Sequence, residues 1–183
     1  MYASRISGTG SYLPERVLSN SDLESMVETN DAWIVERTGI RNRHISSPSQ
    51  VTSDLALMAS KQALAAAGLV ATDLDMIIFC TVSPDQMMPS SACVLQNKLE
   101  ASPVMAFDLS AACSGFVYGV SVADQFIRTG MFKHVLVVGA EILSRFVNYK
   151  DRETCILFGD GAGAAILSRT SVESDSRILS SHM

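Results

Sequence analysis

Two patterns of hydrophobic and polar residues alternate along the chain. Residues 75–82 and 133–140 are continuously apolar, which is typical of strands covered on both faces. A shorter apolar strand begins at Val104, and residues 154–167 predict two strands that are joined, or bent, at glycines. A short first strand ends in a turn at Pro14. These runs predict the strands of one sheet.

Helical periodicity fills the segments between the predicted strands. Ser21 and Glu24 form a capping box that predicts a short helix. Thr52 or Ser53 is expected to cap a longer helix, which ends at Gly68. The other predicted helices cover residues 31–38, 89–99 and 112–129. Strands that alternate with helices in this way favour right-handed crossovers and a mainly parallel α/β sheet with helices on both faces.

The helix predicted over residues 112–129 is the most apolar of the set. It carries no charge before Asp124, so we expect it to be buried rather than to lie on a surface. Gly115, Gly119 and Ala123 recur every four residues and form one thin stripe. Another backbone can approach closely along such a stripe, because no large side chain holds it off.

Cys113 lies at the turn into this helix. Free N–H groups and the positive end of the helix dipole favour the thiolate there, which is the nucleophilic form of cysteine. A second interpretation is equally open, because free cysteines often pack as small hydrophobic residues. Cys80, Cys93 and Cys155 lie in apolar strand-like or helical runs and are interpreted as packing residues.

Composition narrows the class of protein. The 183 residues are 48% hydrophobic, enough to bury a core in one domain or slightly more, and the net charge is −5. This charge argues against a protein that binds nucleic acid or a membrane surface, which needs an excess of Lys and Arg. We expect no membrane span, no signal peptide and no zinc site, since the required apolar lengths and Cys/His spacings are lacking. A reduced, cytoplasmic chain without a bound metal is the expectation.

Three further motifs have both a structural and a functional interpretation. Residues 159–165 are glycine-rich, but their order is not that of a dinucleotide-binding loop and no helix follows, which favours a bulge or a close backbone contact. Arg37, Arg41 and Arg43 could receive a phosphate, although a solvated surface cluster is the simpler interpretation. Trp33 is most simply a core residue, with a stacking role as the alternative.

Four segments of the chain match one family in order and at similar spacing. They are Gly8-Thr-Gly-Ser-Tyr-Leu-Pro14, Trp33-Ile-Val-Glu-Arg-Thr-Gly-Ile-Arg41, Ala111-Ala-Cys-Ser-Gly-Phe116 and Phe158-Gly-Asp-Gly-Ala-Gly-Ala164. With them the chain resembles the β-ketoacyl-acyl-carrier-protein synthase III family, within the thiolase-like superfamily, over the amino-terminal half of the family enzyme. The resemblance implies a thiolase-like half at residues 1–170, with a five-stranded, mostly parallel mixed sheet, helices on both faces and a buried nucleophile helix. Residues 171–183 would begin a linker to a second half.

The resemblance also implies an acyltransferase that starts type II fatty-acid synthesis. Cys113 would take an acyl group from an acyl-CoA, with acetyl-CoA expected. Malonyl-acyl-carrier protein would then decarboxylate, and its carbanion would attack the thioester. The backbone N–H of Cys113 is expected to help hold the thioester oxygen. Coenzyme A enters as part of the substrate, and no separate cofactor is expected.

Further site residues follow from the same resemblance. Trp33 and Arg152 would sandwich the adenine of coenzyme A, and Arg37 and Thr38 would lie along its nucleotide portion. Met88 stands where a Phe is common among bacterial relatives. In the family this side chain reaches across a homodimer and forms the floor of the partner's acyl pocket, so Met88 leaves the preferred primer length open.

The family's catalytic His and Asn lie in a second half that this sequence does not contain. From sequence, none of the three histidines, at positions 44, 134 and 182, can be paired with Cys113. The chain alone is therefore expected to be inactive. Its uncovered apolar face should drive it to form a dimer or to retain a partner half.

Two rival functions remain beside this interpretation. One is another thiolase-like condensing enzyme, which makes a secondary metabolite from a different acyl-CoA. The other is a non-catalytic subunit that keeps the fold and uses the His and Asn of its partner. A nucleotide-binding Rossmann domain ranks last, because the phosphate loop is absent.

Overall fold

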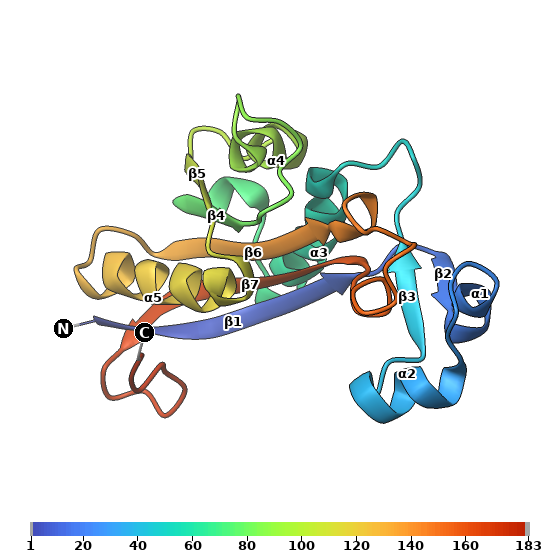
Figure 1. The fold of residues 1–183 in the computed structure, drawn as a ribbon. Coiled ribbons are helices and arrows are strands. Elements are labelled where there is room, and N and C mark those ends of the chain that lie inside the picture. The colour runs from blue at the N-terminus through green and yellow to red at the C-terminus, as the bar shows by residue number, and fades with distance from the viewer. Residues whose placement is uncertain (1, 182–183) are drawn as a thin grey trace.

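The computed structural model describes residues 2–181 and is built around a mixed five-stranded sheet (Figure 1). In spatial order the strands are β1 (Tyr2–Tyr12), β7 (Asp160–Ser171), β6 (His134–Ile142), β4 (Met76–Cys80) and β5 (Met105–Leu109). Strands β4, β5 and β6 are mutually parallel, whereas β7 pairs antiparallel with both β6 and β1. Four strands thus share one direction, which confirms the mostly parallel mixed sheet.

Helices cover both faces of this sheet, as predicted. Helices α3 (Thr52–Ala67) and α4 (Ser91–Leu99) pack on one face, and α5 (Gly115–Arg128) packs on the other (Figure 1). Every residue of β4 is buried, as its continuous apolar pattern requires. Among residues 2–181 we find no helix that is long and apolar enough to cross a membrane.

A small subdomain extends from one end of the sheet (Figure 1). It consists of the antiparallel strands β2 (Arg16–Ser19) and β3 (Asn42–Ile45) with helices α1 (Asn20–Glu24) and α2 (Asp31–Thr38). Its separate core contains Leu18, Leu23, Ile34, Ile45, Cys155 and Ile156. The sequence patterns predicted α2, which ends at the left-handed Gly39, but they did not predict the two short strands.

Three short 3₁₀ turns complete the structure: η1 (Ala71–Asp73), η2 (Ala112–Ser114) and η3 (Leu143–Arg145). Glycines allow the helices to approach the sheet closely. A Cβ at Gly10 would lie 2.2 Å from the carbonyl oxygen of Ala59 in α3. A Cβ at Gly119 would lie 2.7 Å from Sγ of Cys80. The predicted glycine stripe of α5 therefore faces β4 and allows the close approach for which it was identified.

Two predicted helix caps were wrong. Ser19, not Ser21, caps α1, because its hydroxyl accepts from the backbone N–H of Asp22 at 3.2 Å and the Asp22 carboxylate accepts in return from Ser19 N at 2.8 Å. Neither Thr52 nor Ser53 caps α3; the carboxylate of Asp54 accepts from Val51 N at 2.8 Å instead.

Other helix limits were predicted with mixed success. Gly68 ends α3 with a φ of 67°, as predicted. Pro89 lies before the cap residue Ser90, rather than in the first turn of α4.

Two further predictions need correction. Residues 154–158 form turns rather than a second strand, and they are apolar because Cys155 and Ile156 fill the core of the subdomain. Helix α5 is buried on one face only: on its outer face Phe116, Val117 and Tyr118 are exposed, and 53% of Val117 is accessible. The absence of charge on this helix before Asp124 thus reflects an apolar face that is open in this chain, not burial on all sides.

Candidate active site

Cys113 lies on the sharp turn between β5 and α5. The turn η2 begins at Ala112, whose φ of +47° is in the left-handed region that residues other than glycine rarely adopt. Helix α5 starts two residues after Cys113, at Gly115. The thiol is exposed. Strained backbone of this kind gathers at functional sites, so the turn itself marks Cys113 as a candidate nucleophile.

The turn borders a cavity of about 350 Å³. The cavity lies beyond the carboxyl ends of the parallel strands β4 and β6, which is where open α/β sheets bind their ligands. Its lining consists of Leu13, Cys80, Ala112, Cys113, Phe116, Gly139, Ala140, Glu141, Gly161, Ala162 and Gly163. This wall is mainly small and apolar, with one carboxylate at Glu141. It leaves room for a small apolar group next to the thiol.

Cys80 lines the same cavity but has a different environment. Burial, with the nearby negative charges of Asp108 and Glu141, raises the pKa of Cys80 to about 12. Cys80 is therefore a neutral thiol at neutral pH and acts as a packing residue. Burial likewise raises the pKa of Cys155. The predicted packing roles of Cys80 and Cys155 fit these surroundings, and Cys113 is the exposed thiol of the cavity.

Two carboxylates fix the loops around this cavity. Asp108 accepts hydrogen bonds from the backbone N–H groups of Ser91 and Ala92, at 2.9 and 2.7 Å, and so ties the start of α4 to the end of β5. Glu141 accepts from the N–H groups of Val82 and Ser83, at 2.9 and 3.0 Å. It thereby holds the loop that follows β4. Sequence reasoning missed Glu141, although an acidic residue directly after a continuously apolar strand is a signal that could have found it.

Trp33 in α2 is the centre of a second cluster, in the small subdomain. The guanidinium carbon of Arg37 lies 4.3 Å from the centroid of the Trp33 ring, and that of Arg152 lies 4.6 Å from it. Arg152 also donates to the carbonyl oxygen of Glu28 at 3.3 Å. The structure thus brings together Trp33, Arg37 and Arg152, which the resemblance assigned to one binding site. Trp33 is half-buried beside the core of the subdomain, so it packs against that core while its ring also stacks with the two guanidinium groups.

Thr38 adjoins this cluster at the end of α2. Its hydroxyl donates to the carbonyl oxygen of Ile34 at 2.7 Å and accepts from the N–H of Ile40 at 3.0 Å. Both bonds help to end the helix, and one hydroxyl lone pair is left for a ligand.

The basic segment after α2 does not act as one phosphate-binding group. Arg43 is 2% exposed, and its guanidinium donates to Asn20 and to the carbonyl oxygen of Ile156. Arg43 is therefore a structural residue, and both the phosphate and the surface-cluster interpretations were wrong for it. Arg41 is exposed, and its Nη1 lies 3.9 Å from Oδ2 of Asp31. This is the arrangement expected of a solvated surface residue.

Met88 lies apart from Cys113 in this chain. It is 86% exposed in the loop between β4 and α4, and it does not line the Cys113 cavity. Such a side chain can reach a neighbouring molecule, but it has no acyl pocket of its own here.

No histidine among residues 2–181 lines the Cys113 cavity. Nδ1 of His44 lies 2.6 Å from the carbonyl oxygen of Pro14. Nδ1 of His134 lies 2.9 Å from Oγ of Ser168, at the other end of β6. His182 is outside the described residues. None of the described histidines is therefore a candidate general base for Cys113.

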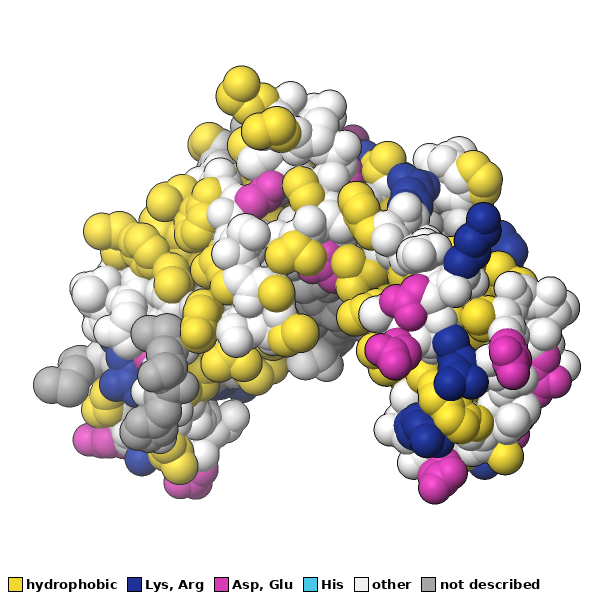
Figure 2. Space-filling model, in the orientation of Figure 1, with side chains coloured by type: hydrophobic (Ala, Val, Ile, Leu, Met, Phe, Trp, Pro, Cys, Tyr) yellow, Lys and Arg dark blue, Asp and Glu magenta, His cyan; other side chains and the backbone are white. Residues whose placement is uncertain are grey.

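An apolar groove continues from the cavity along the sheet. It has a volume of about 430 Å³, and its lining includes Ile6, Thr9, Phe116, Gly139 and Ala165. Figure 2 shows hydrophobic side chains gathered over the face on which α5 lies. We call this groove, with the exposed Val117 and Tyr118, the outer apolar face. Exposed apolar surface of this extent marks a site of association.

Comparisons with known proteins agree with this architecture. The model of the family described as 3-oxoacyl-[acyl-carrier-protein] synthase III matches residues 107–183. A β-ketoacyl-[acyl-carrier-protein] synthase III of Caldanaerobacter subterraneus is 58% identical over 181 residues, which are 99% of this chain and 54% of that protein. The chain spans about half the length of the curated relatives it matches.

Solved structures give the same result. The 3-oxoacyl-[acyl-carrier-protein] synthase III of Aquifex aeolicus is 50% identical, with a TM-score of 0.89 over 91% of this chain and 54% of that one. A priming β-ketosynthase from the R1128 polyketide pathway is 36% identical, with a TM-score of 0.90 over 93% of this chain and 51% of that one. Sequence and fold together confirm the resemblance to the β-ketoacyl-acyl-carrier-protein synthase III family, over a length that corresponds to about half of its members.

Proposed function

We propose that this chain supplies the nucleophile and the coenzyme A-binding surface of a condensing enzyme that starts fatty-acid synthesis. The observation that carries the proposal is the exposed Cys113, on a strained turn, beside a cavity at the carboxyl ends of parallel strands. The proposed setting is the cytoplasm, where a reducing environment keeps the thiol free. The second half of the enzyme would supply the catalytic His and Asn.

The proposed first step is acyl transfer to Cys113. The thiolate attacks the carbonyl carbon of an acyl-CoA, a new carbon–sulfur bond forms, and coenzyme A leaves as its thiolate. The backbone N–H of Cys113 would stabilise the negative charge that develops on the carbonyl oxygen. The cavity of about 350 Å³ limits the acyl group to a short chain unless a neighbouring molecule enlarges the pocket.

The proposed second step is condensation with malonyl-acyl-carrier protein. The malonyl group loses carbon dioxide, and the carbanion that forms attacks the thioester carbon and displaces the Cys113 thiolate. The chain offers no described histidine near Cys113 for this step. The 183-residue chain alone would therefore stop at the acyl-enzyme.

The proposed coenzyme A site is the Trp33 cluster. The flat indole and two guanidinium groups suit an adenine ring and the phosphates attached to its nucleotide. Arg152 already stacks on the Trp33 ring, so an adenine can enter between the two only if Arg152 swings outward. Arg37 and Thr38, on the last turn of α2, would contact the nucleotide portion.

The outer apolar face is proposed to be covered by a second half and the chain to act within a homodimer. Water-exposed Phe116, Val117 and Tyr118 cost free energy that association would recover. Met88, exposed in its loop, would then contribute to the acyl pocket of the other subunit. Sedimentation tests this part: we expect dimers or larger species, and a well-behaved monomer without a second polypeptide would contradict it.

The central experiment is incubation with acetyl-CoA, followed by intact mass and peptide mapping. We expect a mass increase equal to one acetyl group, confined to the peptide that carries Cys113. Cys113→Ser is the control and should show no adduct, while Cys80→Ser should still be acylated. An unmodified wild-type chain, or acetylation that persists in Cys113→Ser, would contradict the proposal.

A second candidate is a condensing enzyme of secondary metabolism that uses another primer. Two observations support this second candidate. The chain is similar to the R1128 priming β-ketosynthase, and Met88, which leaves the preferred primer length open, is exposed. Turnover of the full-length protein with acetyl, branched and longer acyl-CoA primers separates the two candidates. A preference for acetyl-CoA of tenfold or more favours fatty-acid initiation, and a preference for another primer favours the second candidate.

A further inference from the structure

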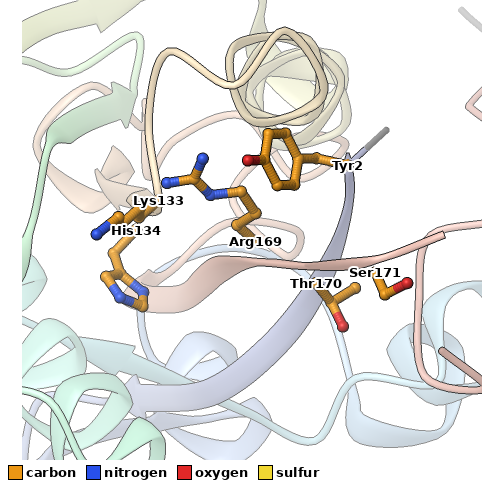
Figure 3. Close-up of a pocket in the computed structure, with 6 residues that line it drawn as sticks. All are labelled: Tyr2, Lys133, His134, Arg169, Thr170 and Ser171. Atoms are coloured by element: carbon orange, nitrogen blue, oxygen red, sulfur yellow. The ribbon is translucent and has the colours of Figure 1, made fainter. Parts of the chain in front are cut away.

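A second pocket lies at the opposite end of the sheet from Cys113. Strand β6 connects the two ends, because Glu141 near its carboxyl end lines the Cys113 cavity and His134 at its start lines this pocket. The pocket has a volume of about 410 Å³. Its lining consists of Tyr2, Lys133, His134, Arg169, Thr170 and Ser171, which come from the ends of three adjacent strands (Figure 3).

Two cationic residues, Lys133 and Arg169, line this pocket side by side. The backbone N–H of Arg169 donates to the carbonyl oxygen of Lys133 at 2.8 Å, so the two side chains start from neighbouring points. The guanidinium carbon of Arg169 lies 4.5 Å from the centroid of the Tyr2 ring. In Figure 3 the guanidinium of Arg169 and the phenol oxygen of Tyr2 point to the same side. Stacking on Tyr2 thus limits the positions of the guanidinium.

These two cations have no acidic partner among residues 2–181. No carboxylate lies within 4.0 Å of the side-chain nitrogens of Lys133 or Arg169 in this part of the chain. The carboxylate of Asp75, just before β4, accepts hydrogen bonds from the backbone N–H groups of Lys133 and His134, at 2.6 and 2.9 Å, and not from the Lys133 side chain. Two adjacent like charges repel each other, and an anion bound between them would relieve that repulsion.

We propose that this pocket binds the phosphate group of a small phosphorylated molecule. A phosphate dianion matches two positive charges, and the planar guanidinium offers two parallel N–H donors to its oxygens. Lys133 adds a third, more mobile donor, and the Tyr2 hydroxyl faces the same space. The pocket is larger than one phosphate, so the remainder of the ligand would contact the Tyr2 ring. The site does not depend on the function proposed for Cys113.

The test is titration of the isotope-labelled chain with inorganic phosphate, followed by amide chemical shifts. Ionic strength is held constant with sodium chloride, because surface charges respond to salt alone. We expect saturable shifts at the amides of Lys133, His134, Arg169 and Thr170, with little change at Cys113. Arg169→Gln and Lys133→Gln should each weaken phosphate binding by about tenfold, as expected for the loss of one charge-assisted contact.

Control variants keep the proposal falsifiable. Arg41→Gln removes an exposed cation outside the pocket and should leave phosphate binding unchanged. Arg169→Gln also loses the contact with Tyr2, and Lys133→Gln tests the site without that loss. The absence of saturable shifts, or equal binding by wild type, Arg169→Gln and Lys133→Gln, would overturn the proposal. Acetylation of Cys113 in all three proteins would show that such a failure leaves the proposed acyl transfer untouched.

Discussion

The two cysteines that line one cavity have opposite surroundings. Cys80 ends the buried strand β4, directly under Gly119 of α5, and its pKa is raised to about 12. Cys113 lies at the open end of the same helix, exposed, on a turn that Ala112 holds in a left-handed conformation. Helix α5 therefore gives the two thiols opposite environments. Its inner face closes over a thiol and keeps that thiol neutral, while its amino end presents another to the solvent.

The largest effect that this comparison predicts is in thiol reactivity. With a pKa of about 12, Cys80 has a thiolate fraction at neutral pH that is about three orders of magnitude below that of an ordinary thiol. Alkylation by iodoacetamide, followed by peptide mapping, should therefore modify the exposed Cys113 much faster than the buried Cys80. Because the pKa is raised, the reactivity of Cys80 should increase only as the pH rises toward about 12. Equal alkylation rates of Cys113 and Cys80 at neutral pH would contradict the predicted difference in thiol reactivity.

The next largest effect concerns the inner face of α5. Gly119→Ala places a Cβ 2.7 Å from Sγ of Cys80 and 3.0 Å from Cγ1 of Val137. Both contacts are too short, so the helix or the packed sheet would have to shift. We expect a loss of about 1–3 kcal/mol in the free energy of unfolding, measured by urea denaturation.

The control for this change is at an exposed position of the same helix. Gln125→Ala alters a residue that is exposed and lies outside the outer apolar face, and it should change the stability by at most ~0.5 kcal/mol. If the two variants were equally stable, the close contact between α5 and β4 would not be a constraint on the fold.

Sequence patterns predicted most of the fold because burial determines them directly. The continuous apolar runs became β4 and β6, which are covered on both faces. The same logic failed at residues 154–158, which are apolar because they fill the core of the small subdomain. It failed again for the outer face of α5, since a pattern of apolar residues cannot say whether the covering surface belongs to the same chain.

The candidate site was predictable only where it depends on local structure. The position of Cys113 at a helix start follows from sequence, and so does the spacing of Trp33 and Arg37 on one face of α2. The approach of Arg152 to Trp33 depends on how distant segments fold together, and the resemblance supplied it, not the pattern. The burial of Arg43 depends on the same packing, and no local pattern reveals it. The catalytic and binding roles of these residues stay predictions.

The smallest effect is the sharpest test of the strained turn. At Ala112 the left-handed φ of +47° costs about 1 kcal/mol, and glycine removes that cost while adding freedom to the unfolded chain. Ala112→Gly should therefore raise the stability by a few tenths to ~1 kcal/mol, while a looser turn slows the acetylation of Cys113 severalfold.

Gly39→Ala is the matched reverse change. The φ of Gly39 is 71° and the new Cβ would meet open space, so this variant should be destabilised by ~1 kcal/mol for conformational reasons alone. A stability loss in Ala112→Gly with unchanged acetylation would mean that the turn is ordinary structure. A gain in stability with slower acetylation would mean that the chain holds Ala112 in strain in order to place the thiol.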